Sequence, residues 1–472
     1  MSYSRRTFLV GAASGFSLLV LTACTDDAPV PAPTTTPALP VAGVPAPTSF
    51  HRSNWANDPY ALGATSYLAV GTLPQIRETL KQPVLDRVYL AGEAISNAPG
   101  TVRGAVASGR SAANALSDAM EQGERVAVIG AGAAGAAAAR VLTANGADVI
   151  VIESRDRTGG RIASYIEGEH AFELGAWRLS DEDDASLIDA LAREGVSVEA
   201  LAGGFAYALS GATAPAELEA DDPALTAAAA GLAGAATWAE QQEHDVSLEE
   251  SIRDGAGASD WPEASDDAVT SEAILTQAQL AVAGLTGADA SELSAWFSNV
   301  VPLTDAAVPA GPLSSFVDAA LEGIDTALST VVVGVFYDSD GVSLRLGTGE
   351  SLSVNRVIVT VPLGVLQEQV IEFNPPLPVS YRGVIDALSV GHIEVVRMEF
   401  DAAFWQTDAV WWVNENEDEL IRTWVNLLPA TGRPILLGVV GGRSAQDLAG
   451  LDDAAVRESA QRSLAPFADP GI

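Results

Sequence analysis

The chain has 472 residues, of which 48% are hydrophobic, and this length allows two or three domains around a large core. Its 62 acidic and 25 basic residues give a net charge of −37, which argues against binding to nucleic acid and against electrostatic binding to anionic lipid. Cys24 is the single cysteine, so no disulfide bond can form within the chain. We expect no metal site, because His170 and His244 each lack a second ligand nearby.

The first 24 residues predict an export segment rather than part of the fold. Ser4–Leu9 (SRRTFL) resembles a twin-arginine signal, and an apolar run, Phe8–Ala23, overlaps and follows it. Leu21–Cys24 (LTAC) resembles a bacterial lipobox, in which the cysteine is lipidated. We therefore expect export by the twin-arginine route and a lipid anchor on the outer face of the bacterial cytoplasmic membrane; an uncleaved membrane anchor is the alternative. Residues 25–48 are rich in Pro, Thr and Ala, and predict a disordered tether.

Two elements are predicted before residue 120. A strand is expected near Val88–Leu90, and a helix from Thr101 through Leu116. The first amides of such a helix have no partner within it, and its dipole is positive at that end. The helix start therefore favours a nearby negative charge, with a simple capped helix as the alternative.

The stretch Val126–Arg161 predicts a strand, a tight turn, a helix and a second strand. Three glycines follow the first strand in the G-x-G-x-x-G spacing: Gly130, Gly132 and Gly135. The first glycine allows the tight turn, the second allows the backbone to approach a pyrophosphate, and the third allows the helix to pack on the strand. The second strand ends at Glu153, where an acceptor for a ribose hydroxyl is expected. The stretch therefore predicts a dinucleotide site.

The residues that follow distinguish FAD from NAD. Arg155–Arg161 (RDRTGGR) resembles the R-x-x-x-G-G-R signature of the flavin-containing amine oxidases, which include monoamine and polyamine oxidases and lysine-specific histone demethylases. Phe172–Trp177 (FELGAW) resembles the family's next block, whose backbone lies along the flavin ring. Trp55–Tyr67, Val88–Glu93 and Gly100–Ala105 resemble blocks that lie at the family's C-terminus, yet here they precede the glycine-rich loop. The resemblance implies a circularly permuted chain.

The fold class that this resemblance implies is α/β, with a Rossmann-like FAD-binding domain of the glutathione-reductase type and an α+β substrate domain. It implies FAD bound without a covalent bond, because Ala64 stands where monoamine oxidases have the cysteine linked to the flavin. The expected FAD contacts are Gly130, Gly132, Ala134, Gly135, Glu153, Arg155, Gly160, Arg161, Gly175, Ala176, Trp177, Arg178, Val332, Glu93, Thr101 and Val102.

The chain departs from the family around the substrate. Amine oxidases usually place a lysine, bonded through water to flavin N5, at the position of Val395, and Lys81 is the only lysine of this chain. Arg397 is expected on the same strand face, either near the flavin or in a salt bridge. The family's aromatic pair is replaced by Thr65 and Thr101. The residues expected near the flavin are Trp55, Thr65, Val395 and Arg397, while Tyr67 or Trp177 would narrow the site.

The remaining sequence completes the predicted domains. Helices are expected at 181–194 and 267–285, a strand pair at 330–346 with a turn at Asp340-Gly341, and a strand at 357–361. Phe400, Phe404 and Trp405 are expected in the core. The predicted segments are 1–24 (signal), 25–48 (tether), 49–122 and 123–205 (FAD domain), 206–325 (helical substrate segment), 326–376 (FAD-domain strands) and 377–472 (substrate-domain sheet and helices).

The expected function is that of an FAD-dependent oxidoreductase. It would transfer a hydride from a C–N bond of a small amine, or a related substrate, to flavin N5, and O₂ or another acceptor would reoxidise the flavin. Two alternatives stay open: a non-catalytic FAD-binding lipoprotein, and a desaturase or porphyrinogen-type oxidase. The expected membrane contact is through the lipid anchor only.

Overall fold

A computed structural model describes residues 43–168, 170–180, 184–297 and 306–469, all of which belong to one folded unit. The expected export segment with Cys24, and most of the expected tether, lie outside the described residues. Within the described ranges, no helix is both long enough and apolar enough to cross a bilayer.

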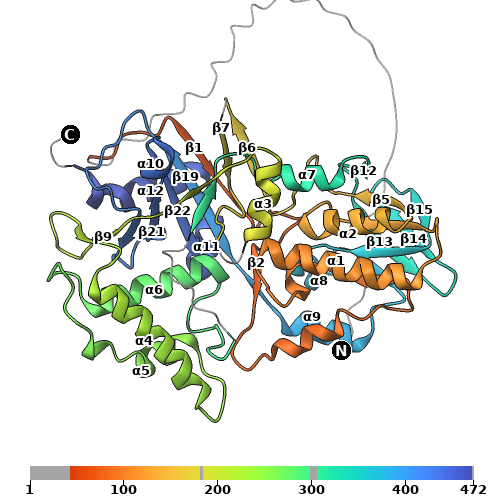
Figure 1. Cartoon of the computed structure of the whole chain (residues 1–472), viewed down its shortest axis with the longest axis horizontal. Helices are drawn as coiled ribbons and strands as arrows, with labels where there is room; N and C mark the ends of the chain where they lie inside the picture. The colour runs from red at the N-terminus through yellow and green to blue at the C-terminus, as the bar shows by residue number, and fades with distance from the viewer. Residues whose placement is uncertain (1–42, 169, 181–183, 298–305, 470–472) are drawn as a thin grey trace, which may run out of the picture. The chain divides into compact units, whose positions relative to one another are not determined.

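A parallel sheet of five strands holds the glycine-rich loop (Figure 1). In spatial order its strands are β12 (Asp325–Ala327), β5 (Asp148–Ile152), β4 (Arg125–Ile129), β16 (Arg356–Val359) and β3 (Val88–Leu90). The inner strands β4 and β16 are almost fully buried, as expected for a parallel sheet covered on both faces. β3 thus pairs with β16, a strand that lies far after it in the sequence.

Two helices pack together beside this sheet, α1 (Val102–Ala119) and α2 (Ala133–Ala144). The helix predicted from Thr101 is confirmed: Thr101 is its N-cap, and the Thr101 side chain accepts a hydrogen bond from the Gly104 amide. A four-stranded sheet adjoins this half, and the predicted turn at Asp340-Gly341 connects two of its strands. This sheet contains, in spatial order, β15 (Ser351–Val354), β14 (Val342–Leu346), β13 (Val332–Tyr337) and β17 (Glu372–Asn374).

A mixed sheet of seven strands forms the second half. Its spatial order is β1 (Ser49–Arg52), β19 (Ile393–Glu399), β22 (Ile435–Gly441), β21 (Thr423–Asn426), β20 (Trp411–Asn414), β9 (Phe205–Ala208) and β10 (Ala216–Leu218). Phe400, Phe404 and Trp405 are buried beside it, as predicted. β1 differs from the expected domain boundaries: it falls in the segment expected in the FAD domain, but it pairs antiparallel with β19.

Helix α6 (Ser271–Thr286) packs against the seven-stranded sheet. Helix α4 (Pro223–Glu240) packs against α6 and against α5 (Leu248–Gly255). The helix predicted at 267–285 begins later, because the Thr270 side chain caps it by accepting the Ala273 amide. Of the helix predicted at 181–194, the structure shows α3 (Ala185–Arg193), and residues 181–183 lie outside the described part.

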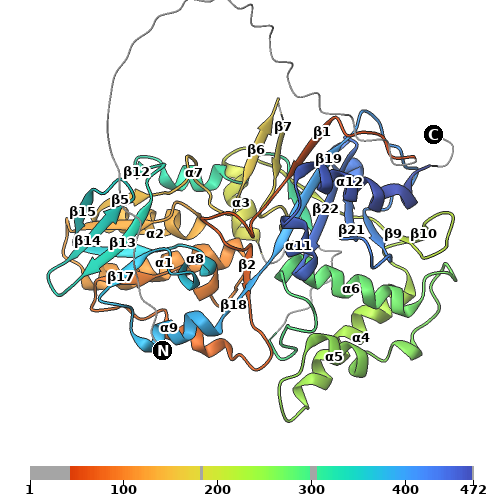
Figure 2. The same ribbon diagram turned by 180° about the vertical axis from the view of Figure 1, so that it is seen from behind.

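A short antiparallel sheet connects the two halves: β2 (Thr65–Tyr67) pairs with β18 (Ser389–Gly391). Figure 2 shows it between the two large sheets. The remaining elements are η1 (Pro74–Thr79), η2 (Glu93–Ile95), β6 (Ser164–Glu167), β7 (His170–Glu173), β8 (Val198–Ala200), η3 (Ala258–Asp260), β11 (Ala307–Pro309), α7 (Ser315–Leu321), α8 (Leu363–Gln367), α9 (Val379–Ala387), α10 (Leu428–Thr431), α11 (Gly442–Ala449), α12 (Asp453–Leu464) and η4 (Ala465–Phe467).

Candidate functional site

A cavity of about 1160 Å³ lies where the two halves meet. Its wall is formed by the β4–α2 loop, the end of β5, the start of α1, the β2 strand, and residues of α6 and β19. The volume exceeds the usual range for small-molecule pockets, about 300–1,000 Å³. The cavity is therefore large enough for an extended cofactor together with a substrate.

The glycine-rich loop forms one end of the cavity wall. Gly130 has a φ of 106°, which favours glycine, and its amide donates to the Ile152 carbonyl at 2.8 Å. Gly132 is the N-cap of α2, and a Cβ built on it would have no protein atom closer than 3.6 Å. A Cβ at Gly135 would lie 1.9 Å from the Gly130 carbonyl oxygen, so this glycine allows the helix to pack on the turn.

Glu153 lies at the end of β5, where the sequence places it, and is 5% exposed. Its carboxylate accepts the Ala131 amide and the Arg155 amide, each at 2.8 Å. These bonds hold the carboxylate against the glycine-rich loop, and the residue lines the cavity. Its backbone carbonyl accepts the Thr330 amide at 2.8 Å, which brings the segment before β13 to this end of the cavity.

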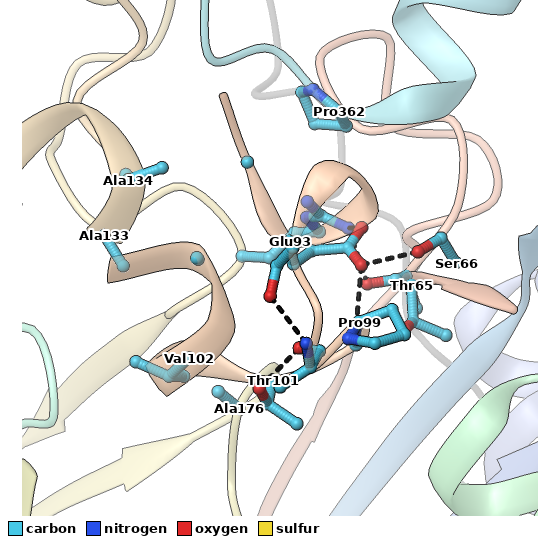
Figure 3. A pocket seen from close by; sticks show the side chains of 18 of the residues that line it. Thr65, Ser66, Glu93, Pro99, Thr101, Val102, Ala133, Ala134, Ala176 and Pro362 are labelled. Carbon is cyan, nitrogen blue, oxygen red and sulfur yellow. Dashed lines mark hydrogen bonds and ion pairs between the residues drawn. The ribbon is translucent and has the colours of Figure 1, made fainter. Parts of the chain in front are cut away.

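Glu93 is the second buried carboxylate of the wall, at 6% exposure. It accepts hydrogen bonds from the Ser66 hydroxyl at 2.7 Å and from the Gly100 amide at 2.8 Å, and it pairs with the Arg161 guanidinium at 3.0 Å. Figure 3 shows Glu93 in the wall, with Ser66 on one side and the start of α1 at Thr101 on the other. The network joins three segments that are distant in sequence.

Two arginines of the RDRTGGR stretch are held in the wall by carboxylates. Arg155 binds both oxygens of Asp58, at 3.0 and 2.8 Å, and lies over the Tyr60 ring. Arg161 donates to the Ala64 carbonyl as well as to Glu93. Both arginines line the cavity, and each also forms an ion pair with a carboxylate of the wall, Arg155 with Asp58 and Arg161 with Glu93.

The starts of α1 and α2 open on the same cavity, as the labelled Val102 and Ala133 show in Figure 3. The Thr101 hydroxyl donates to the Ala98 carbonyl at 2.8 Å while it caps α1. The first amides of both helices have no partner within the helix, so two positive dipole ends meet here. An anion at each helix start would be stabilised.

Aromatic and apolar side chains form the other end of the cavity. Trp55, Tyr67, Trp177 and Val395 line it, and the Trp55 indole donates to the Leu174 carbonyl at 3.0 Å. Burial raises the pKa of the Tyr67 hydroxyl, and the charge of Glu292 raises it further. Thr65 also lines the cavity, so five of the six residues expected to border or narrow the flavin site meet here, and Arg397 is the exception.

Most of the expected cofactor contacts line this cavity. They are Gly130, Gly132, Ala134, Glu153, Arg155, Gly160, Arg161, Gly175, Ala176, Trp177, Arg178, Glu93, Thr101 and Val102. Three expected site residues do not line it: Gly135, Val332 and Arg397. Gly135 lies one helical turn behind the wall, packed on Gly130.

Val332 and Arg397 are placed elsewhere for identifiable reasons. Val332 packs inside the core of the β13–β14 sheet, while Thr330, two residues earlier, is bonded to Glu153. Arg397 is 2% exposed, pairs with Glu399 at 2.7 Å and lies over the Phe172 ring at 4.4 Å. The salt bridge, one of the two roles expected for Arg397, is therefore the one observed.

Several residues of the cavity wall carry no recognisable signal in the sequence. Leu285, Thr286, Trp296 and Phe297 come from α6 and the segment after it, a region without a recognisable motif. Arg77 is 3% exposed and lines the wall, and its Nε donates to the Ala94 carbonyl at 2.7 Å. Within the described ranges, no group of three His, Cys, Asp or Glu side chains is placed to hold a metal ion.

The chain is similar to proteins of known activity. Rice (Oryza sativa subsp. japonica) Polyamine oxidase 4 is 34% identical over 137 residues, which are 29% of this chain and 28% of that protein. Human Lysine-specific histone demethylase 2 is 28% identical over 158 residues, 32% of this chain and 19% of that protein. The chain thus spans less than a third of the length of either relative in these matches.

Solved structures share the fold. A putrescine oxidase bound to putrescine is 20% identical with a TM-score of 0.57, and cyclohexylamine oxidase from Brevibacterium oxydans IH-35A is 20% identical with a TM-score of 0.56. Both matches cover 74% of this chain and 82% of the other. The family described as flavin containing amine oxidoreductase matches residues 36–117 and 133–470, most of the chain. The chain belongs to the flavin-containing amine oxidoreductase family.

Proposed function

We propose that the chain binds FAD without a covalent bond in this cavity and oxidises a small amine. The observation that carries the proposal is the convergence of two helix starts and two buried carboxylates, Glu153 and Glu93, on one large cavity. FAD has a pyrophosphate, ribose hydroxyls and a ring that becomes negative on reduction, and each group has a complementary partner here.

The wall fits the cofactor in shape and in chemistry. Gly132 lines the cavity at the start of α2, where a phosphate would bind, and the φ and ψ of this residue require no glycine. Ala64 lines the cavity without a nucleophile. Cys24 lies outside the described residues, and no other cysteine exists in the chain. These features support non-covalent binding.

Each part of the wall has a proposed role. Glu153 accepts a ribose hydroxyl, the start of α2 holds the pyrophosphate, and Arg155 and Arg161 balance its charge. Thr101 and Val102 would hold the flavin ring against the start of α1, where the helix dipole would stabilise negative charge on the ring. FAD bound in this way supplies the two-electron acceptor at N5.

The other end of the cavity is proposed to hold the substrate. Trp55, Trp177 and Tyr67 form an apolar wall that excludes water from the reacting C–H bond. Lys81, the only lysine, does not line the cavity and is bonded to Glu78 and Asn97. Val395 lines the cavity where the family lysine is expected, so this part of the wall would offer a bound flavin no ammonium group.

The visible spectrum of the purified protein tests this proposal. We expect the two absorption bands of oxidised flavin, and loss of the longer-wavelength band when an amine is added anaerobically. A colourless protein contradicts FAD binding. A yellow protein that no amine of a broad panel bleaches contradicts the oxidase activity and indicates a non-catalytic flavoprotein.

We also propose that the chain is a circularly permuted member of the family. Its FAD-domain segments would be 49–122, 123–205 and 326–376, and its substrate-domain segments 206–325 and 377–472, except that β1 joins the substrate-domain sheet. β3 and α1 precede β4 in sequence but share its sheet and helix layer, which supports the proposal. A chain that starts near Val126, with residues 46–118 joined after Ile472, should fold and bind FAD. If deletion of residues 50–118 leaves FAD binding intact, the proposal is wrong.

The last proposal concerns location. We propose that residues 1–24 direct export by the twin-arginine route, that Cys24 is lipidated on the outer face of the bacterial cytoplasmic membrane, and that residues 25–48 tether the enzyme. The sequence of the segment supports this. Cys24→Ser should release the protein from the membrane fraction, and replacement of Arg5 and Arg6 by lysine should retain it in the cytoplasm. Membrane association unchanged by Cys24→Ser contradicts the lipid anchor.

A further inference from the structure

Glu394 is a buried carboxylate next to the cavity that the proposed chemistry does not use. It precedes Val395 on β19 and is 1% exposed. One of its oxygens accepts the Ser53 hydroxyl at 2.5 Å, and the other accepts the Ala56 amide at 3.1 Å. Glu394 therefore holds both ends of the loop Ser53–Ala56.

This loop carries Trp55 into the cavity wall. Trp55 is 6% exposed, its indole donates to the Leu174 carbonyl at 3.0 Å, and its carbonyl accepts the Gly63 amide at 2.9 Å. A Cβ built on Gly175 would lie 3.1 Å from Cζ2 of Trp55, so the indole is packed directly on this backbone. Contacts thus run from Glu394 through the loop to the Leu174–Gly175 wall.

We propose that Glu394 is a positioning residue. Its charged carboxylate holds the Ser53–Ala56 loop, and this loop in turn holds Trp55 against the Leu174–Gly175 backbone. FAD affinity therefore depends on the charge of Glu394. The proposal rests on FAD binding in the cavity, as proposed above. It assigns Glu394 no contact with the cofactor or the substrate.

The hydrogen bonds favour the charged form of the carboxylate. The Ser53 hydroxyl already accepts the Val395 amide at 2.8 Å, so its own proton is available to Glu394. The Ala56 amide is also a donor. Both partners present protons, and a protonated Glu394 could keep both contacts only by donating to Ser53 Oγ, so that both bonds would join neutral groups and would be weaker than bonds to a carboxylate. The loop is therefore held less tightly when the carboxyl is neutral.

Burial opposes this preference and raises the pKa of Glu394 to about 7, while the bonds from Ser53, Ala56 and Trp55 and the charge of Arg52 lower it. Arg52, on β1, is itself paired with Asp453 at 2.7 Å. β22 carries no charged residue. The other titratable groups on β19 are Arg397 and Glu399, and His392 directly precedes the strand. The helices packed against β19 carry Glu272 on α6, and Arg443 and Asp447 on α11. The charge of Glu394 therefore changes near neutral pH.

The test measures the dissociation constant of FAD from pH 5.5 to 8.5 in the parent, Glu394→Gln and Ser53→Ala proteins. In the parent, we expect affinity to fall about tenfold below pH 7, as expected for the loss of one charge-assisted hydrogen bond. Glu394→Gln, which keeps the shape without the charge, should bind FAD as weakly as the parent at low pH and without this pH dependence. Ser53→Ala removes one donor, so its midpoint should move to higher pH.

A second measurement separates this inference from FAD binding itself. The near-ultraviolet circular dichroism of the parent should change with a midpoint near pH 7, and the change should shrink in Glu394→Gln and in Trp55→Phe. A protein that binds no FAD at any pH contradicts the proposed function, and the dichroism then decides the role of Glu394. The inference is overturned if FAD affinity depends on pH equally in the parent and in Glu394→Gln. It is also overturned if neither Glu394→Gln nor Trp55→Phe alters the pH-dependent change in dichroism.

Discussion

Substitution of Gly132 separates binding of the cofactor from stability of the fold. Gly132 has a φ of −80° and a ψ of −175°, an extended conformation that any residue adopts. The nearest protein atom to a built Cβ is the Gly159 carbonyl oxygen at 3.6 Å, an ordinary contact. Gly132→Val therefore adds its side chain to the cavity side of the loop, with little strain in the protein.

The expected magnitudes differ widely. Valine is a poorer N-cap than glycine, which should cost about 1 kcal/mol of folding free energy. A phosphate displaced from the start of α2 loses at least two hydrogen bonds to a charged group, each worth about 1.5–3 kcal/mol. We therefore expect FAD affinity to fall about a hundredfold or more, while the melting temperature of the flavin-free protein changes by roughly 2 °C.

Gly135→Ala is the matched comparison. Its Cβ would lie 1.9 Å from the Gly130 carbonyl oxygen, so this smaller substitution should destabilise the fold itself. Flavin content is measured by absorbance after gel filtration, and stability by thermal melting of the flavin-free proteins. Normal flavin content in Gly132→Val would refute the position of the pyrophosphate. A large loss of stability in that variant would refute the steric reasoning.

Four further results are expected. Glu153→Ala should weaken FAD binding by about 1–3 kcal/mol, for the loss of one hydrogen bond to a charged group, as measured by flavin titration; unchanged affinity would exclude a ribose contact. Acid precipitation should leave the flavin in the supernatant, because Ala64 provides no thiol; flavin in the pellet would disprove this. Val395→Lys should change the rate of flavin reoxidation by O₂ more than FAD affinity in stopped-flow measurements, and an unchanged rate would contradict the register of β19. Burial raises the pKa of Glu173 from 4.5 to about 7. The protonated carboxyl therefore stabilises the folded protein below pH 4.5, and about 3 kcal/mol of this stability is lost as pH rises through 7. Glu173→Gln should remove this loss, measured by denaturant unfolding at pH 5 and 8; if the carboxyl titrates normally, the parent protein shows no such loss.

Parts of the candidate site that depend on local backbone geometry are predictable from sequence. The turn at Gly130, the N-cap of α2 and the acid at Glu153 lie within one strand–helix–strand unit, and the structure places them as their spacing predicts. Thr101 likewise caps α1 through a bond to Gly104, only three residues away. Such features need only short-range bonds, so spacing is sufficient to locate them.

Features that depend on strand register or on contacts between distant residues are harder to predict from the sequence. Val332 was expected among the FAD contacts, but it does not line the cavity, and the residue of this segment bonded to Glu153 is Thr330. The sequence did not predict β1 as a strand of the substrate-domain sheet, because its four half-buried residues show no alternation of buried and exposed positions. Neither position could be found without the partner strand, since pairing sets the register.

By itself, the sequence determined the presence of a dinucleotide-type βαβ unit, the likeness to the amine oxidase family and the absence of a second cysteine or lysine. These follow from residue types and short spacings. Only the tertiary structure decided that Glu93 and Arg161 pair, that Trp296 and Phe297 reach the cavity, and that Glu394 holds the loop of Trp55. The physical reason is that these contacts join residues tens to hundreds of positions apart, and sheet pairing and core packing bring such residues together in ways that no local pattern records.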